Sequence, residues 1–145
     1  SGMTFLDLCS APGNKTAQAI ETPELVAFAC DLHAHRLRTV DAPVCGRIQL
    51  DATGPLPFRG VFDRILIDAP CSGTGTLGRN PEIRWRLQPS DIEDLQQRQM
   101  SILRHGLECL SDSGRLVYST CSLEREENED VVASLGSAVR ASSSM

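Results

Sequence analysis

Short runs of consecutive apolar residues, separated by amphipathic stretches, constrain the fold of this chain more than any other feature of its sequence. Within each run the apolar residues follow one another instead of alternating with polar ones, which is typical of strands buried on both faces of a parallel sheet. We expect five such strands, at Thr4–Leu8, Leu25–Cys30, Arg47–Leu50, Phe62–Ile67 and Leu116–Ser119. The alternation of strands with amphipathic stretches indicates an α/β fold with right-handed crossovers.

Four helices are expected between and after these strands. Short helices are predicted at Lys15–Glu21 and His33–Val40, and a long one from Ser90 to about Leu110 with apolar residues along one face. Ser90 and Glu93 predict a capping box at the start of the long helix. A last helix is predicted to begin at Ser122, with acidic residues favourably placed in its first turn.

Composition indicates one globular domain. The chain has 145 residues, of which 41% are hydrophobic and 23% charged, and this excludes the disordered and collagenous classes. We expect residues 3–135 to form the core and residues 136–145 to fray. No apolar run reaches the about 18 residues of a membrane span and no signal peptide is recognisable, so a cytoplasmic protein without membrane contact is expected. The net charge of −5 argues against a non-specific polyanion binder, although a local basic stripe would still serve a nucleic acid substrate.

The six cysteines do not have the spacing of a zinc site, and no secretory signal supports a disulfide framework. We therefore expect no metal. Cys71 and Cys121 each follow a predicted strand and are flanked by Pro and Thr, so they are candidates for chemistry. A helix that begins just after Cys121 would favour its thiolate form through the helix dipole. The other four thiols are expected to pack in the core or, for Cys9, to form a turn.

A turn of small residues follows the first predicted strand, at Cys9-Ser10-Ala11-Pro12-Gly13-Asn14-Lys15. Such a turn lets a ligand approach backbone N–H groups at the start of a helix. The turn does not match a P-loop, because the two required glycines are replaced by Cys9 and Asn14. A dinucleotide-binding glycine pattern occurs at residues 73–78, but the following Arg-Asn-Pro prevents the helix that this pattern needs.

Aspartates follow three other predicted strands: Asp31, Asp51 and Asp68. The carboxyl ends of parallel strands face the crevice in which open α/β sheets bind ligands. Asp31 follows Gly13 at close to the spacing of an acid that binds ribose hydroxyls. Any one of these aspartates could instead cap the next helix. Together they favour a nucleoside ligand, and the lack of a phosphate-binding pattern favours S-adenosylmethionine over a dinucleotide.

Three motifs make the chain resemble the Sun/Fmu-type RNA (cytosine-5) methyltransferases: D-L-C-S-A-P-G-N-K-T at 7–16, D-A-P-C-S-G-T-G at 68–75 and Y-S-T-C-S-L-E-R-E-E-N-E at 118–129. The resemblance extends from about Thr4 to Leu135 and preserves the order of the motifs. It implies an α/β fold, the Rossmann-like class I methyltransferase core with a mostly parallel sheet. Asn14 departs from the family, which usually has a second glycine there. Because the family has more strands and an N-terminal RNA-binding region, we expect the chain to be truncated at both ends.

The resemblance also implies an activity: methyl transfer from S-adenosylmethionine to carbon 5 of a cytosine in RNA, with 16S ribosomal RNA as the expected substrate. Cys121 would be the nucleophile, and Cys71 would help to release the product. Asp68 would contact the target cytosine, with Lys15 close to both cofactor and base. The cofactor pocket would be lined by Cys9, Ser10, Ala11, Pro12, Gly13, Asn14, Lys15, Asp31, Asp51 and Asp68.

The chemistry explains the need for a thiol and a carboxyl group. A thiolate that adds to carbon 6 of cytosine makes carbon 5 nucleophilic, and a carboxyl group near N3 and N4 polarises the ring. Physical chemistry alone does not choose between the two thiols, because DNA (cytosine-5) methyltransferases use the Pro-Cys thiol, here Cys71. A DNA methyltransferase that uses Cys71 and a non-catalytic nucleoside- or RNA-binding fragment remain as alternatives.

A basic stretch follows the Pro-Cys motif and contains Arg79, Arg84, Trp85 and Arg86. It is either a solvated loop or a surface that holds RNA phosphates and stacks a base.

For the oligomeric state, we expect a monomer.

Overall fold

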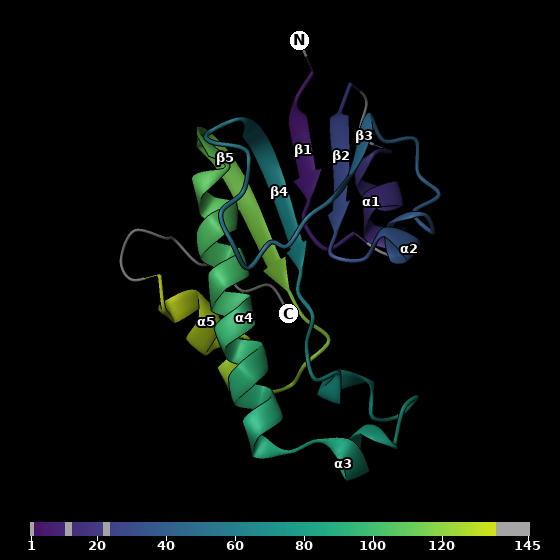
Figure 1. Cartoon of the computed structure of the whole chain (residues 1–145), viewed down its shortest axis with the longest axis vertical. Helices are drawn as coiled ribbons and strands as arrows, with labels where there is room; N and C mark the ends of the chain where they lie inside the picture. Colours follow the sequence, from purple (N-terminus) through teal and green to yellow (C-terminus); the bar gives the residue numbers. More distant parts are fainter. Residues whose placement is uncertain (1, 11–12, 22–23, 136–145) are drawn as a thin grey trace.

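The structure is a computed structural model, and it describes residues 2–10, 13–21 and 24–135. Its five strands form one sheet in the order β3-β2-β1-β4-β5 (Figure 1), and every neighbouring pair is parallel. The α/β fold with a parallel sheet is therefore confirmed. The strands are β1 (Thr4–Asp7), β2 (Val26–Asp31), β3 (Gly46–Gln49), β4 (Phe62–Asp68) and β5 (Leu110–Ser119). Of the predicted features, Ala11, Pro12 and the tail 136–145 lie outside the described residues.

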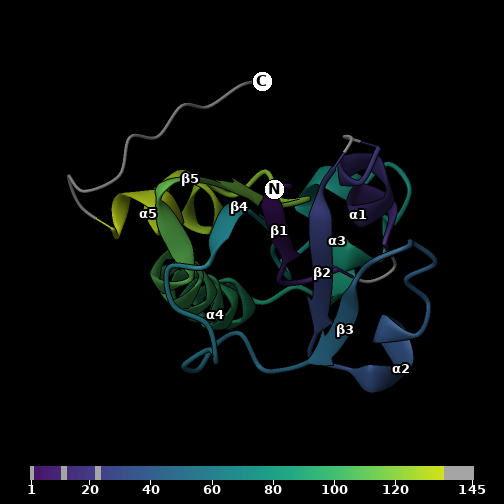
Figure 2. The ribbon, with the colours of Figure 1, turned by 90° about the horizontal axis from the view of Figure 1, so that it is seen from above.

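The long helix α4 (Pro89–Glu108) packs against β4 and β5 (Figure 2). Its approach to the sheet is close at Gly106, where an added Cβ would lie 3.0 Å from Ile67 Cδ1 and 3.1 Å from Leu8 Cδ1. The core lies at this contact, and its largest buried members include Leu6, Leu8, Ile65, Ile67 and Leu103. No helix in the described part of the chain is both long and apolar enough to cross a membrane.

The remaining helices are short. They are α1 (Asn14–Ala19), α2 (Ala34–Leu37), α3 (Ile83–Arg86) and α5 (Glu129–Ala133), with 3-10 turns at Thr74–Thr76 and Arg125–Glu127. The helix α2 packs against β2 and β3, α5 packs against α4, and α3 lies beyond the sheet (Figure 1). The helix α3 lies in the basic stretch, for which the sequence predicted no helix.

The capping box predicted at the start of α4 is wrong by two positions. Gln88 is the N-cap: its backbone N–H donates to Asp91 Oδ2 at 2.8 Å, and its side chain accepts from the backbone of Asp91. Gln88 precedes Pro89, and the residue before a proline is disfavoured in helical backbone, so α4 begins directly after Gln88. Serine is a much more common N-cap than glutamine, which is why the sequence pointed to Ser90.

The start predicted for the last helix, Ser122, is also wrong. The chain stays irregular to Glu124, passes through the 3-10 turn and enters α5 only at Glu129. The side chain of Asn128 explains this, because its Nδ2 donates to the carbonyls of Ser122 at 3.0 Å and Glu124 at 2.8 Å. No helix therefore starts next to Cys121, and the helix-dipole argument for its thiolate is wrong.

Candidate functional site

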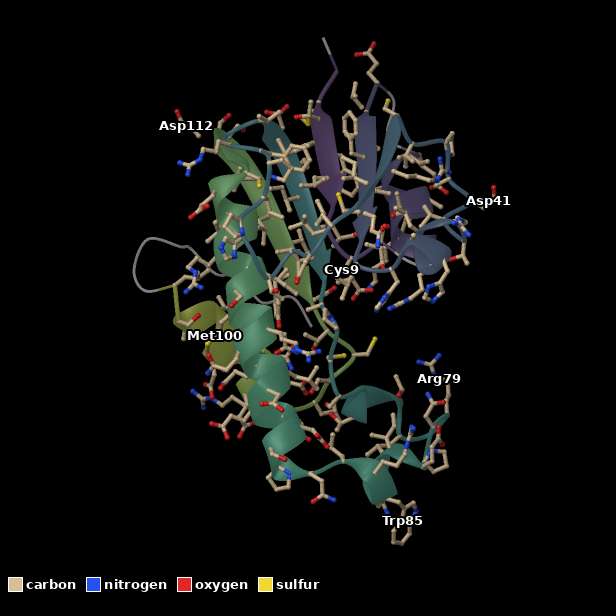
Figure 3. The ribbon with its side chains drawn as sticks, in the orientation of Figure 1. Cys9, Asp41, Arg79, Trp85, Met100 and Asp112 are labelled. Atoms are coloured by element: carbon tan, nitrogen blue, oxygen red, sulfur yellow. The ribbon has the colours of Figure 1, made fainter. Side chains whose placement is uncertain are left out.

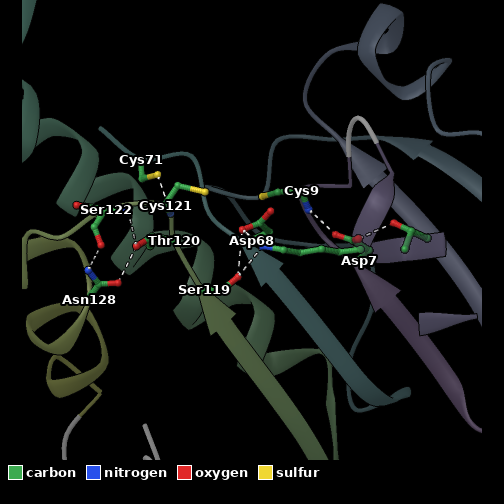
Figure 4. Close-up of polar contacts among 11 residues, drawn as sticks. Asp7, Cys9, Asp68, Cys71, Ser119, Thr120, Cys121, Ser122 and Asn128 are labelled. Atoms are coloured by element: carbon green, nitrogen blue, oxygen red, sulfur yellow. Dashed lines mark hydrogen bonds and ion pairs between the residues drawn. The ribbon is translucent and has the colours of Figure 1, made fainter. Parts of the chain in front are cut away.

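The carboxyl ends of β1, β4 and β5 place polar side chains at one edge of the sheet (Figure 4). Asp68 and Ser119, the last residues of β4 and β5, are register partners. The loops that follow these two strands carry Cys71 and Cys121. The parallel pairing of β4 and β5 therefore brings together two motifs that are fifty positions apart in the sequence.

Lys15, in the first turn of α1, completes a polar group with these strand ends. Its Nζ lies 2.7 Å from Asp68 Oδ1 and donates to Ser119 Oγ at 3.4 Å, while Ser119 Oγ donates to Asp68 Oδ1 at 3.0 Å. Lys15 and Asp68 are partly exposed, so their ion pair contributes only about 0–1 kcal/mol to stability. The arrangement places a cation, a carboxylate and a hydroxyl at one point that solvent reaches.

Asp7 is a buried acid that the site residues inferred from sequence did not include. Its Oδ2 accepts from Thr16 Oγ1 at 2.6 Å and its Oδ1 from the backbone N–H of Cys9 at 3.2 Å. These bonds fasten the turn and α1 to the end of β1. Burial raises the pKa of Asp7 to about 6, aided by the nearby charge of Asp68 and opposed by the two hydrogen bonds and by Lys15. The signal in the sequence was its place as the last residue of a buried strand.

The two cysteine loops contact each other directly. The backbone N–H of Cys121 donates to Cys71 Sγ at 3.2 Å (Figure 4). Cys121 is exposed and Cys71 is half-buried, and burial raises the pKa of the Cys71 thiol. Two further bonds with backbone donors join the loops, from Gly75 N to Cys121 O and from Leu123 N to Thr74 Oγ1, each 2.8 Å long. Ser122 Oγ also bonds Ser72 Oγ at 3.3 Å and Thr74 Oγ1 at 3.2 Å. The loops therefore behave as one unit.

Asp31 and Asp51 lie at the ends of the outer strands. Asp31, the last residue of β2, is buried, and its Oδ1 accepts from the N–H of His33 at 3.1 Å. Asp51 follows β3 and is exposed, with Oδ1 accepting from the N–H and the hydroxyl of Thr53 at 2.9 and 2.6 Å. The bonds from Thr53 hold the pKa of Asp51 below its ordinary value. Asp31 thus lies at the same strand-end edge as Asp7, whereas the Asp51 carboxylate binds within its own turn.

The turn between β1 and α1 is shaped by backbone constraints. Ser10 Oγ donates to the carbonyl of Cys30 at 2.9 Å, which ties the turn to β2. Gly13 has a φ of 102°, and an added Cβ would lie 3.0 Å from Val40 Cγ1, so only glycine fits. Burial raises the pKa of Cys9 to about 12, which leaves this thiol protonated and consistent with a packing role. Asn14 begins α1.

These residues fit S-adenosylmethionine. The edge offers carboxylate acceptors at the ends of β1, β2 and β4, which suit ribose hydroxyls and a cationic ligand and would repel a pyrophosphate. Gly13 allows the left-handed backbone that turns the chain from β1 into α1 against Val40, behind these carboxylates. Among the described residues, no group of three or more His, Cys, Asp and Glu side chains is arranged to hold a metal ion.

The all-parallel sheet and the acidic strand ends define a Rossmann-like fold of the kind that S-adenosylmethionine-dependent methyltransferases share. The family model for the 16S rRNA methyltransferase RsmB/F matches residues 1–142. The chain belongs to this family, which confirms the resemblance seen in the three motifs.

Individual relatives agree with this assignment. The chain is 40% identical over 143 residues to ribosomal RNA small subunit methyltransferase B of Yersinia pseudotuberculosis, covering 92% of this chain and 33% of that protein. The crystal structure of PH0851 superposes with a TM-score of 0.86 at 31% identity, covering 97% and 34% of the two chains. NSun6 from Pyrococcus horikoshii, solved with the S-adenosylmethionine analogue SFG, gives 0.77 at 30% identity, covering 91% and 36%. The chain thus spans about a third of the length of these relatives.

Proposed function

We propose that this chain is the catalytic core of an RNA (cytosine-5) methyltransferase that acts on 16S ribosomal RNA through a covalent adduct of Cys121. The observation that carries the proposal is the contact between the two cysteine loops beside the Lys15–Asp68 pair. A nucleoside-binding module would have no need for two thiols at that point.

The surroundings of the two thiols support different roles for them. Cys121 is exposed, so a base can reach its sulfur, whereas the sulfur of Cys71 already accepts a hydrogen bond from Cys121 N. Burial raises the pKa of Cys71, which keeps a proton on this thiol at neutral pH. A protonated thiol suits proton transfer during product release. The accessible sulfur of Cys121 supports this residue as the nucleophile, over the alternative of a DNA methyltransferase that uses Cys71.

The proposed reaction uses side chains of this site. The Cys121 thiolate forms a bond to carbon 6 of the cytosine, and the displaced electron pair makes carbon 5 nucleophilic. Asp68 binds the N3 and N4 edge of the ring, and Lys15, 2.7 Å from its Oδ1, holds the carboxylate in place. Bound S-adenosylmethionine supplies the methyl group that carbon 5 receives. Loss of the carbon 5 proton to a base then restores the double bond and releases the thiolate.

The RNA has to deliver an unstacked base to Cys121, because the sulfur cannot reach carbon 6 within a helix. The basic stretch after the Pro-Cys loop is suited to hold the strand. Trp85 in α3 is 83% exposed, and Figure 3 shows its ring projecting from α3 away from the sheet. An exposed aromatic ring among arginines can stack a base while the cations bind phosphates.

The test has two stages. Calorimetric titration of the chain with S-adenosylmethionine measures cofactor binding, and a tritiated-methyl assay on 16S ribosomal RNA measures transfer. Transfer is assayed in a chimera in which this chain replaces the matching third of the Yersinia relative. Cofactor binding without transfer to any RNA in an otherwise folded chimera would favour the non-catalytic alternative.

Cysteine variants of the chimera assign the roles. We expect Cys121→Ala to abolish transfer and Cys71→Ala to accumulate an RNA–protein adduct that resists denaturation. Cys45 is exposed, so its predicted packing in the core is wrong. Cys45→Ala removes this thiol outside the site, serves as the control and should retain transfer. An adduct in Cys121→Ala that is missing in Cys71→Ala would reverse the two roles.

A further inference from the structure

Glu127 has a fully buried carboxylate in a stretch of otherwise accessible acidic residues. Its Oε1 accepts from Ser72 N at 2.8 Å and from Gln99 Nε2 at 3.2 Å. Its Oε2 accepts from Ser72 Oγ at 2.6 Å and from Ser122 Oγ. Both oxygens are therefore fully engaged by donors of the protein, and the proposed reaction makes no use of this carboxylate.

The donors come from three separate parts of the fold. Ser72 directly follows Cys71, and Ser122 directly follows Cys121. Gln99 belongs to α4 and also donates to the carbonyl of Pro70 at 2.8 Å, so it fixes the start of the same Pro-Cys loop. One carboxylate thus binds the neighbour of each thiol and anchors both to the long helix.

Apolar packing does not explain this arrangement. A buried carboxylate remains unfavourable unless it is both paired with a cation and hydrogen-bonded, and none of the ion pairs among the described residues involves Glu127. Gln99 Oε1 is buried without a hydrogen-bond partner, which is also energetically unfavourable. Both unfavourable groups lie where the two cysteine loops join.

We propose that Glu127 is a positioning residue that sets the separation of the Cys71 and Cys121 thiols before RNA binds. The effect of Glu127 on catalysis rests on the proposed function, but its effect on the separation of the two thiols does not. With the thiols held together, Cys71 is in place to exchange a proton when the bond from Cys121 to the base breaks.

The separation is measured by cross-linking the chain with dibromobimane, which becomes fluorescent when both of its arms have alkylated thiols. Peptide mapping by mass spectrometry then gives the ratio of Cys71–Cys121 cross-link to single alkylation at Cys121. Glu127→Gln keeps the size of the side chain but replaces one acceptor oxygen by a donor. We expect this ratio to fall about 10-fold or more, since displacements near 1 Å change such proximity effects by up to about 100-fold.

Asp63→Asn is the matched control. Asp63 also joins separate elements, because it accepts from Thr4 N at 3.1 Å, Thr4 Oγ1 at 3.2 Å and Ser111 Oγ at 3.2 Å. It lies near the other end of β4, away from the thiols. Because Asp63 is partly exposed and Glu127 is fully buried, urea unfolding of both variants accompanies the measurement, and the proposal requires the ratio to fall only in Glu127→Gln while this variant is folded. An unchanged ratio in Glu127→Gln, or an equal fall in Asp63→Asn, would overturn it.

Ser122→Ala provides a second variant if Glu127→Gln does not fold. It removes one tether and leaves the bonds to Ser72 and Gln99, so a smaller fall in the same ratio is expected, and none would count against the proposal. In the chimera, Glu127→Gln should lower kcat and leave KM for the RNA unchanged. Absence of transfer in the unmodified chimera would reject the proposed function, while the cross-linking ratio would still decide the role of Glu127.

Discussion

Gly75→Ala is expected to displace the Thr-Cys loop. Gly75 lies in the 3-10 turn Thr74–Thr76, and its N–H donates to the carbonyl oxygen of Cys121 at 2.8 Å. A Cβ added at Gly75 would lie 2.8 Å from that same oxygen, about 0.6 Å inside the 3.4 Å at which ordinary contact begins. The obstructing atom is backbone, so no side-chain rotation relieves the overlap and one loop has to move.

The cost follows from the size of this overlap. Overpacking of this kind destabilises proteins by about 1–3 kcal/mol. A shift of about half an ångström at Cys121 should also lower methyl transfer by roughly 10-fold, since about 1 Å of misplacement costs up to about 100-fold. We therefore expect a loss of stability of about 1–3 kcal/mol together with a roughly 10-fold loss of methyl transfer.

Urea unfolding of the chain measures the stability, and the dibromobimane ratio and transfer by the chimera measure the geometry. Gly78→Ala is the control, because a Cβ there meets nothing within 4 Å and the glycine has no positive φ. It should be neutral or stabilising by about 0.4–1 kcal/mol. If Gly75→Ala unfolds like Gly78→Ala and keeps the cross-linking ratio, the steric reasoning is refuted.

Three further changes test other parts of the site. Burial raises the pKa of Asp7 from 3.8 to about 6, so the folded chain binds this proton more tightly and loses stability, on the order of 3 kcal/mol, as the pH rises from about 4 to 6. Asp7→Asn should lack that decline. The unfolding free energies of both chains, measured in urea, should therefore differ by an amount that changes between about pH 4 and 6. A constant difference across this range would contradict the prediction. Lys15→Gln should change the unfolding free energy by less than about 1 kcal/mol, because its ion pair with Asp68 is partly exposed, yet strongly reduce transfer. Trp85→Ala should leave stability within about 0.5 kcal/mol, because the ring is exposed, and raise KM for RNA; an unchanged KM would remove Trp85 from the RNA surface.

Most of the sheet could be predicted because buried parallel strands have a distinctive run of apolar residues. The start of β5 could not: the strand begins at Leu110, whereas the prediction began at Leu116. Ser111, Asp112 and Gly114 resemble a turn, but Ser111 instead binds Asp63 of β4 across a register shift. Within the described residues β5 pairs only with β4, and an edge strand tolerates such polar residues.

The site was predictable where a local motif carries it. Cys71, Cys121, Lys15 and Asp68 are in motifs, and the structure brings them to one edge. Glu127 was predicted only as one of the acidic residues near the start of a helix that begins at Ser122, and its partner Ser72 is 55 positions away. Long-range hydrogen bonds of this kind leave no local pattern, so only the fold reveals them.

The strand order also governs when the site can form as the chain folds. β1 lies between β2 and β4, and its register partner for Phe5 in β4 is Arg64, 59 positions later. The β1-β2-β3 half can pair early, but β1 remains an open edge until β4 arrives, and such long-range pairings form slowly. The contact between the backbone N–H of Cys121 and the sulfur of Cys71 also needs β5 and the segment up to Glu127. We therefore expect the Cys71–Cys121 contact to appear last during refolding, which makes it a reporter of completed folding.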